Sequence, residues 1–433
     1  MRRVIFLFSL IASLSTPAFA QPFDALIPFE EGIAGISDFA MFSDKDGSLL
    51  FIREAESALV LVLNDQLEVE KRFRADNIPS EDSHEQLGYT YTNGELSIVF
   101  LNRSTYEYEV LSIFPESEES LKQAVDMSRL SGGNVFWGTF TYEGSLHVVR
   151  IPRGTNKIRL CKFEGQTEFA TQEYDVEEED FLNAVRDNLT RIDLDNPPSL
   201  ESTYLPGKLY QYGNQLYLSL DDKGATHVVH INLKTGEKEE FTLDAPTLAA
   251  SAKSNSLIIG DVICQASANR DSLKISMIHM DTEEEIGQYV YGRKDDIDVR
   301  FDGPYKSEGL DPVVEITSTD EYLFELNESS YIALGGEMLI DSVMELQIGG
   351  VEAEVITGVT GMVIEEKFSK TYFTTFFSTY TWNPLFSMPE PLVNRRFPPP
   401  AHLTKPLFKT FQINGVPYFG YYDEDKGAIY LSR

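Results

Sequence analysis

An aromatic and proline-rich stretch, residues 368–400, has the composition that most favours ligand binding. It reads FSKTYFTTFFSTYTWNPLFSMPEPLVNRRFPPP and holds a single acidic residue. Exposed aromatic rings stack on sugars or peptides, and Arg adds bidentate hydrogen bonds. The candidate binding residues are Tyr372, Tyr380, Trp382, Arg395 and Arg396. The alternative is a strand over 372–381 with core aromatics, followed by a stiff proline connector.

Acid-rich turns are the only candidates for a metal site. Calcium takes about six to eight oxygen ligands from carboxylates and carbonyls. The candidate ligands are Asp296, Asp298 and Asp302, although the ligand order of an EF-hand is absent. Turns also favour Asp and Gly for backbone reasons alone. We therefore expect no cofactor, with calcium at this site as the alternative.

The histidines and cysteines indicate no catalytic centre. No HExxH, CxxC, GxSxG, P-loop or dinucleotide motif occurs, and the carboxylates are too abundant to nominate a glycosidase pair. The sequence therefore nominates no catalytic residue. Cys161 and Cys264 fall in different repeat units, whereas a disulfide needs Cα atoms within about 7 Å. We expect two buried free thiols and no disulfide.

The stretch Leu209–Leu243 shows which elements must position these residues. Its apolar residues alternate along 215–220, which is typical of a strand. The turns Gly213-Asn214, Asp222-Lys223-Gly224 and Thr235-Gly236 offer residues that tolerate positive φ. The stretch therefore reads as four strands joined by three tight turns, and about 35 residues is the size of one propeller blade.

Looser copies of this unit recur along the chain. The sixth is predicted to begin with strands over Tyr322–Leu326 and Ser330–Leu334, and Ser256–Cys264 is predicted as one strand of the fifth. Helical spacing predicts short helices over Ser117–Leu130 and Phe181–Ile192. The expected insertions between units lie near 115–132, 175–205, 293–318 and 345–405.

The two ends of the chain complement each other. The last unit has three predicted strands, and Ala25–Phe29 near the start is an unassigned strand. In a ring of blades the N-terminal strand can complete the last blade. We therefore predict that Ala25–Phe29 pairs with Ala428–Leu431. This rhythm of strands and turns resembles secreted β-propellers as a class, and the resemblance implies one all-β propeller domain over 21–433, with seven blades, or six or eight.

The first residues resemble an export signal. Arg2-Arg3 precedes the apolar run Val4–Leu14, and Ala18-Phe19-Ala20 supplies the small residues for cleavage after Ala20. We expect a signal peptide over 1–20, a secreted or periplasmic mature protein, and no membrane anchor. The net charge of −33 disfavours nucleic acid as a partner.

These observations favour binding over catalysis. We expect an exported, non-enzymatic binding or scaffold propeller whose ligand is a glycan, a peptide or an envelope protein. The alternative is an extracellular carbohydrate-active enzyme, a hydrolase or lyase, on the same scaffold. The sequence leaves the ligand and the oligomeric state open.

Overall fold

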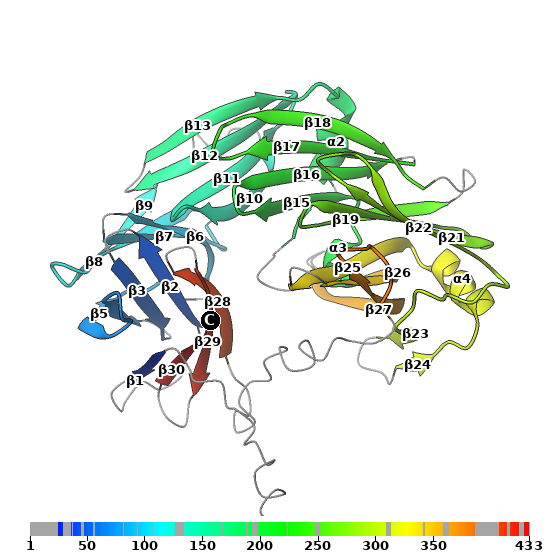
Figure 1. Cartoon of the computed structure of the whole chain (residues 1–433). Coiled ribbons are helices and arrows are strands. Elements are labelled where there is room, and N and C mark those ends of the chain that lie inside the picture. The colour runs from blue at the N-terminus through cyan, green and yellow to red at the C-terminus, as the bar shows by residue number, and fades with distance from the viewer. Residues whose placement is uncertain are drawn as a thin grey trace, which may run out of the picture.

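The computed structural model describes the main body of the chain. The described residues are 25–28, 36, 38–44, 47–54, 57–80, 82–92, 94–105, 107–125, 134–165, 168–187, 189–192, 198–222, 224–246, 252–308, 313–340, 343–357, 363–385, 407–413, 416–423 and 428–432. They form antiparallel strands almost throughout, with a few short helices (Figure 1). Within these ranges no helix is long and apolar enough to cross a membrane.

Within the described residues the strands form seven sheets, which we call blades. Blades 1 to 5 are up-and-down meanders in chain order. Blade 1 consists of β2 (Asp38–Asp44), β3 (Gly47–Arg53), β4 (Ser57–Leu63) and β5 (Val69–Asp76). Blade 2 consists of β6 (His84–Thr92), β7 (Glu95–Asn102), β8 (Tyr108–Phe114) and β9 (Glu119–Val125). Blade 3 consists of β10 (Asn134–Tyr142), β11 (Ser145–Pro152), β12 (Lys157–Gly165) and β13 (Glu168–Asp175).

Blades 4 and 5 continue the same pattern. Blade 4 consists of β15 (Gly207–Tyr212), β16 (Gln215–Asp222), β17 (Ala225–Asn232) and β18 (Lys238–Asp244). A short strand, β14 (Leu189–Arg191), runs parallel to β15 at its free edge. Blade 5 consists of β19 (Lys253–Ile259), β20 (Val262–Ala268), β21 (Ser272–His279) and β22 (Glu285–Gly292).

The last two blades use strands out of chain order. Blade 6 has the order β25 (Tyr331–Ile340), β26 (Val343–Thr357), β27 (Val363–Ser378), β23 (Asp302–Glu308) and β24 (Val314–Glu315). Blade 7 has the order β28 (Leu407–Ile413), β29 (Val416–Asp423), β30 (Ala428–Ser432) and β1 (Ala25–Pro28). The outer strands of both blades thus come from earlier in the chain.

The closing strand confirms the predicted pairing of the chain ends. β1 runs antiparallel to β30, with Ala25 opposite Leu431 and Pro28 opposite Ala428. Figure 1 shows these ends, coloured blue and red, side by side. Blade 7 also packs against blade 1, because β28 contacts β2. The chain is therefore a β-propeller with seven blades, as the repeat rhythm predicted.

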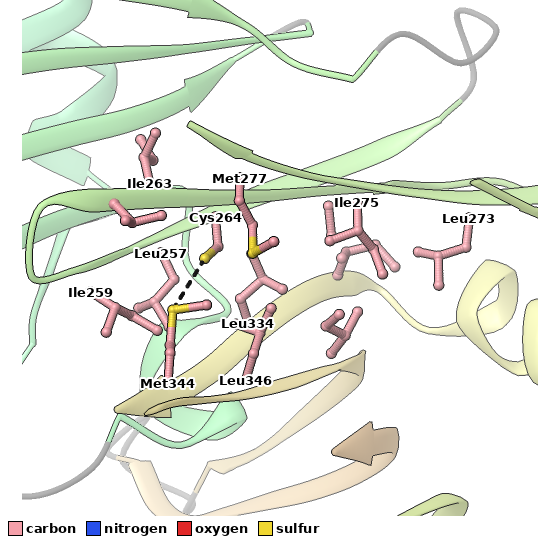
Figure 2. Close-up of a cluster of buried hydrophobic side chains, with 14 of the residues drawn as sticks. Leu257, Ile259, Ile263, Cys264, Leu273, Ile275, Met277, Leu334, Met344 and Leu346 are labelled. Atoms are coloured by element: carbon pink, nitrogen blue, oxygen red, sulfur yellow. Dashed lines mark hydrogen bonds between the residues drawn. The ribbon is translucent and has the colours of Figure 1, made fainter. Parts of the chain in front are cut away.

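Apolar side chains between neighbouring blades hold them together. All eight residues of β11 are buried, because a middle strand has blades on both faces. One large core joins blades 5 and 6, where Cys264 and Met277 of β20 and β21 meet Leu334 and Met344 of β25 and β26 (Figure 2). Outer strands such as β5 instead alternate between buried and exposed residues.

Two local predictions of secondary structure are wrong. Within the expected helix Ser117–Leu130 the structure has the strand β9, because its backbone completes the edge of β8 and this pairing outweighs a short helical pattern. The expected strand Tyr322–Leu326 lies instead in the helix α4 (Thr319–Glu328). The hydroxyl of Ser318 accepts a hydrogen bond from Glu321 N at 3.2 Å, so the spacing Ser-x-x-Glu marks a helix start.

Other expected boundaries also shift. Ser256–Cys264 contains the turn between β19 and β20, because Gly260 with a φ of 63° ends the first strand. Residues 345–378, expected as part of an insertion, form the long blade strands β26 and β27. The helix predicted over Phe181–Ile192 is present in its first part as α2 (Glu179–Asp187), and β14 follows it.

Candidate functional site

The free face of blade 6 carries a short helix, α3 (Leu200–Thr203), from the segment before blade 4. Two glycines allow this approach. A Cβ atom at Gly335 would lie 2.7 Å from the carbonyl oxygen of Pro198, and one at Gly349 would lie 3.0 Å from Leu200 Cδ1. A larger residue at Gly335 would push the helix away from the sheet, and one at Gly349 would crowd both the helix and the carbonyl oxygen of Thr371 on β27. Glycine in β25 and β26 therefore creates the seat for α3.

Five aromatic side chains surround this seat, and we call them the aromatic cluster. They are Tyr204, Tyr305, Tyr331, Phe368 and Tyr372. The ring of Tyr204 lies edge-on to Tyr331 at 5.0 Å and to Phe368 at 5.9 Å. The rings of Tyr305 and Tyr372 are 6.1 Å apart. The β-sheet register places Tyr372 opposite both Gly349 and Tyr305, so their side chains share one face of the sheet.

The aromatic cluster is only partly buried. Tyr331 is 38% exposed, and the other four rings are half-buried against Leu200, Ala333 and Val351 or beside one another. Partly exposed rings with fixed orientation offer flat apolar surfaces at little entropic cost. This arrangement can stack on a sugar ring or on the side chains of a peptide.

An ion pair adds a polar group to the aromatic cluster. Lys370 Nζ pairs with the carboxylate of Glu201 on α3, and it lies 5.6 Å from the centre of the Tyr372 ring. Burial tends to raise the pKa of Glu201, but the hydrogen bond and charge of Lys370, together with hydrogen bonds from the backbone N–H of Glu201 and from Ser199, outweigh burial and lower that pKa. The two side chains retain 29% and 26% of their exposure, so they can still meet hydroxyl or amide groups of a ligand.

The structure places one of the predicted binding residues, Tyr372, in the aromatic cluster. Tyr380 lies beyond the end of β27 and is 81% exposed. Trp382 packs on the core of blades 5 and 6, and its carbonyl oxygen accepts a hydrogen bond from Tyr289 at 3.1 Å. Arg395 and Arg396 lie outside the described residues. Sequence reasoning missed Tyr204, Tyr305 and Tyr331, because they come from separate segments, and it did not select Phe368, which lies in the same stretch as Tyr372.

The three candidate metal ligands have separate partners. Asp296 pairs with Arg300 at 3.3 Å, and Asp298 accepts a hydrogen bond from Tyr291 at 2.7 Å. Asp302 accepts one from the hydroxyl of Tyr305 at 2.5 Å. Across the described ranges, no group of three or more His, Cys, Asp or Glu side chains could hold a metal ion. Calcium binding by these residues stays a prediction.

Both cysteines are buried free thiols. Cys161 lies on β12, and Thr171 Oγ1 is 3.6 Å from its sulfur. Cys264 lies on β20, 4.0 Å from the sulfur of Met344 (Figure 2). Burial raises the pKa of Cys264 to about 12. The thiolate that nucleophilic chemistry requires is therefore suppressed at Cys264.

A serine, a histidine and a carboxylate meet at the end of β6. Ser83 Oγ lies 2.8 Å from Nδ1 of His84, and Nε2 of His84 lies 3.3 Å from Glu109. Lys122 Nζ also forms an ion pair with the carboxylate of Glu109, at 2.6 Å. The backbone N–H groups of Ser83 and His84 both donate to the carbonyl oxygen of Ser80. These two donors are thus committed within the turn and do not form an oxyanion hole.

Comparison with known proteins identifies no family. No family model matches the chain, and no curated protein sequence matches it. A search of solved structures matches chains at 12% identity with TM-scores near 0.3. The match to the WD40 domain of SCAP from fission yeast covers 82% of this chain and 74% of the SCAP chain, with a TM-score of 0.31. The match to a DUF4221 family member from Bacteroides vulgatus covers 88% of this chain and 98% of that protein, with a TM-score of 0.31. The match to the Dos1 propeller covers 78% of this chain and 77% of the Dos1 chain, with a TM-score of 0.29.

Proposed function

We propose that this propeller is an exported binding protein that holds a glycan or peptide against the aromatic cluster of blade 6. One observation supports this most directly: the rings of Tyr204, Tyr331 and Tyr372 lie partly exposed around α3, beside the ion pair of Lys370 and Glu201. Fixed aromatic surfaces next to hydrogen-bonding groups are the usual components of sugar and peptide sites.

The geometry of the cluster favours an uncharged ligand. Lys370 already has its carboxylate partner, so the pair presents hydrogen-bonding atoms rather than a net charge. A strongly acidic chain, with a net charge of −33, repels polyanions at longer range. Neutral oligosaccharides and unstructured peptides are therefore the ligands to test first.

The test compares two tyrosines on printed arrays of oligosaccharides and peptides. We expect Tyr331→Ala to weaken binding of the best ligand by about tenfold or more, because a stacked ring at an interface centre contributes roughly 2 kcal/mol. Tyr380→Ala is the matched control, since Tyr380 is 81% exposed and lies outside the cluster. Equal losses in both variants, or no loss at Tyr331, would exclude the cluster as the site.

Export is the second part of the proposal. It rests on the apolar segment within residues 1–20, which ends in Ala18-Phe19-Ala20. Mass spectrometry of the secreted or periplasmic fraction should give a mature chain that begins at Gln21. An intact N-terminal Met1 in the purified protein would contradict export by this signal.

A further inference from the structure

The hairpin of β11 and β12 in blade 3 concentrates positive charge in an acidic chain. Residues 150–162 read RIPRGTNKIRLCK, with five basic side chains and no acidic one, although the net charge of the chain is −33. Strand pairing fixes these side chains in space, so their mutual repulsion is built into the fold. Such an island favours an anion nearby.

Arg150 is the buried member of this hairpin. It retains 4% of its exposure. Successive residues of a strand point to opposite faces, so Arg150 shares the face of Leu146. Leu146 packs against Leu87 and Val99 of blade 2, and Tyr108 of blade 2 belongs to the same group. Arg150 therefore lies between blades 2 and 3.

The neighbours of Arg150 do not neutralise its charge. Arg159 stands directly opposite it on β12, and Glu173 stands opposite Arg159 on β13. Glu173 bonds Arg159 at 2.7 Å and Lys157 at 2.8 Å, so one carboxylate already serves two cations. Among the residues that the structure describes, no carboxylate pairs with Arg150. Burial lowers the pKa of Arg150, yet guanidinium stays protonated in proteins.

Arg150 is not completely enclosed, because it retains 4% of its exposure. An unpaired charge inside a protein is costly, and a bound counter-ion would remove that cost.

We propose that Arg150 binds a small oxyanion, phosphate or sulfate, at the boundary of blades 2 and 3, with Arg159 adding to the local positive field. The planar fork of guanidinium matches the oxygens of such ions in a bidentate manner. This site lies on another blade than the aromatic cluster and does not depend on it. Phosphate and sulfate share the same recognition chemistry, so the experiment measures each ion separately. It must also distinguish binding of a free ion from binding of a phosphate group attached to a sugar.

Equilibrium dialysis with radiolabelled sulfate or phosphate, at constant ionic strength in chloride, tests the site. We expect one ion per chain and an affinity at least tenfold weaker in Arg150→Met. Arg153→Met is the matched control, because Arg153 is exposed in the turn of the same hairpin, and it should change affinity less than twofold. Competition by glucose 6-phosphate would show that the site admits a group carried on a sugar.

Thermal unfolding supplies an independent readout. In chloride alone, Arg150→Met should unfold at the same or a higher temperature than the wild type, because the variant buries no unpaired charge. Added sulfate should raise the midpoint of the wild type by about 1.5 °C at tenfold excess over the dissociation constant, and leave the variant unchanged. Absence of stoichiometric uptake, equal weakening by Arg153→Met, or equal sulfate gains in both proteins would overturn the proposal.

Discussion

Replacing Asp221 by Asn should destabilise the joint between blades 4 and 5 more than any conservative change nearby. Asp221 Oδ2 lies 3.0 Å from Nζ of Lys208, and the two side chains are 3% and 0% exposed. The same oxygen accepts hydrogen bonds from the backbone N–H of Ser256 at 2.9 Å and from its hydroxyl at 3.1 Å. Thr226 donates to the other oxygen at 2.7 Å. One carboxylate thus ties β15, β16, β17 and β19 together.

The expected cost follows from what each substitution leaves behind. Asp221→Asn leaves the ammonium of Lys208 buried without a counter-charge, which costs about 3–5 kcal/mol. Lys208→Met leaves a carboxylate that keeps its donors from Ser256 and Thr226, so we expect about 1–3 kcal/mol. The double variant buries no charge and should be more stable than Asp221→Asn alone.

Thermal unfolding of the four proteins at equal concentration measures these differences. If the chain unfolds as one unit, about 1 °C corresponds to 1 kcal/mol at this length, so Asp221→Asn should lower the midpoint by roughly 4 °C. The double-mutant cycle then reports the coupling of the pair. Equal losses for the two single variants, or strictly additive losses in the double variant, would refute the reasoning about an uncompensated buried charge.

Three further predictions address other joints. His147 stacks on Phe140 at 5.1 Å, and burial lowers the pKa of His147 to about 4. The unfolded chain alone takes up this proton below about pH 6.5, so stability should fall by up to about 3 kcal/mol between pH 6.5 and pH 4, and His147→Leu should flatten that part of the pH–stability curve. Ile27→Asp should cost about 3 kcal/mol or more in urea unfolding, because Ile27 is 1% exposed in the closing strand, whereas Ile27→Val should cost about 1. Gly349→Ala should cost about 1–3 kcal/mol, because its Cβ would collide with the carbonyl oxygen of Thr371, and it should open the α3 segment to limited proteolysis, because the same Cβ would lie 3.0 Å from Leu200 Cδ1.

Local patterns were sufficient for most of the blade architecture. The strands of blade 4 match the stretch Leu209–Leu243, because alternation and turn residues act over a few positions. The closing pair of β1 and β30 was also predictable, since an incomplete last unit requires a strand from elsewhere. Both inferences depend on features that lie within single units or at the chain ends.

Predictions failed where tertiary pairing decides the structure. Residues 119–125 carry a helix-like spacing, but the free edge of β8 offers backbone hydrogen bonds that a short helix cannot match. The outer strands β23 and β24 of blade 6 precede α4 in the chain, whereas its other strands follow α4, and no local sequence pattern predicts this strand order. The aromatic cluster was equally inaccessible, because Glu201 and Lys370 are 169 positions apart.

The position of the aromatic cluster depends on three blades at once. The segment that leads to it is anchored to blade 4, where Ile192 N donates to Leu209 O at 2.9 Å, and to blade 6, where Gly336 N donates to Pro198 O at 2.9 Å. Asn255 of blade 5 donates to the carbonyl oxygen of Tyr204 at 3.1 Å. A helix of four residues has no stability of its own, so these contacts fix α3 and the Tyr204 side chain that follows it. The site is therefore a property of blades 4, 5 and 6 packed together, and a single excised blade would not reproduce it.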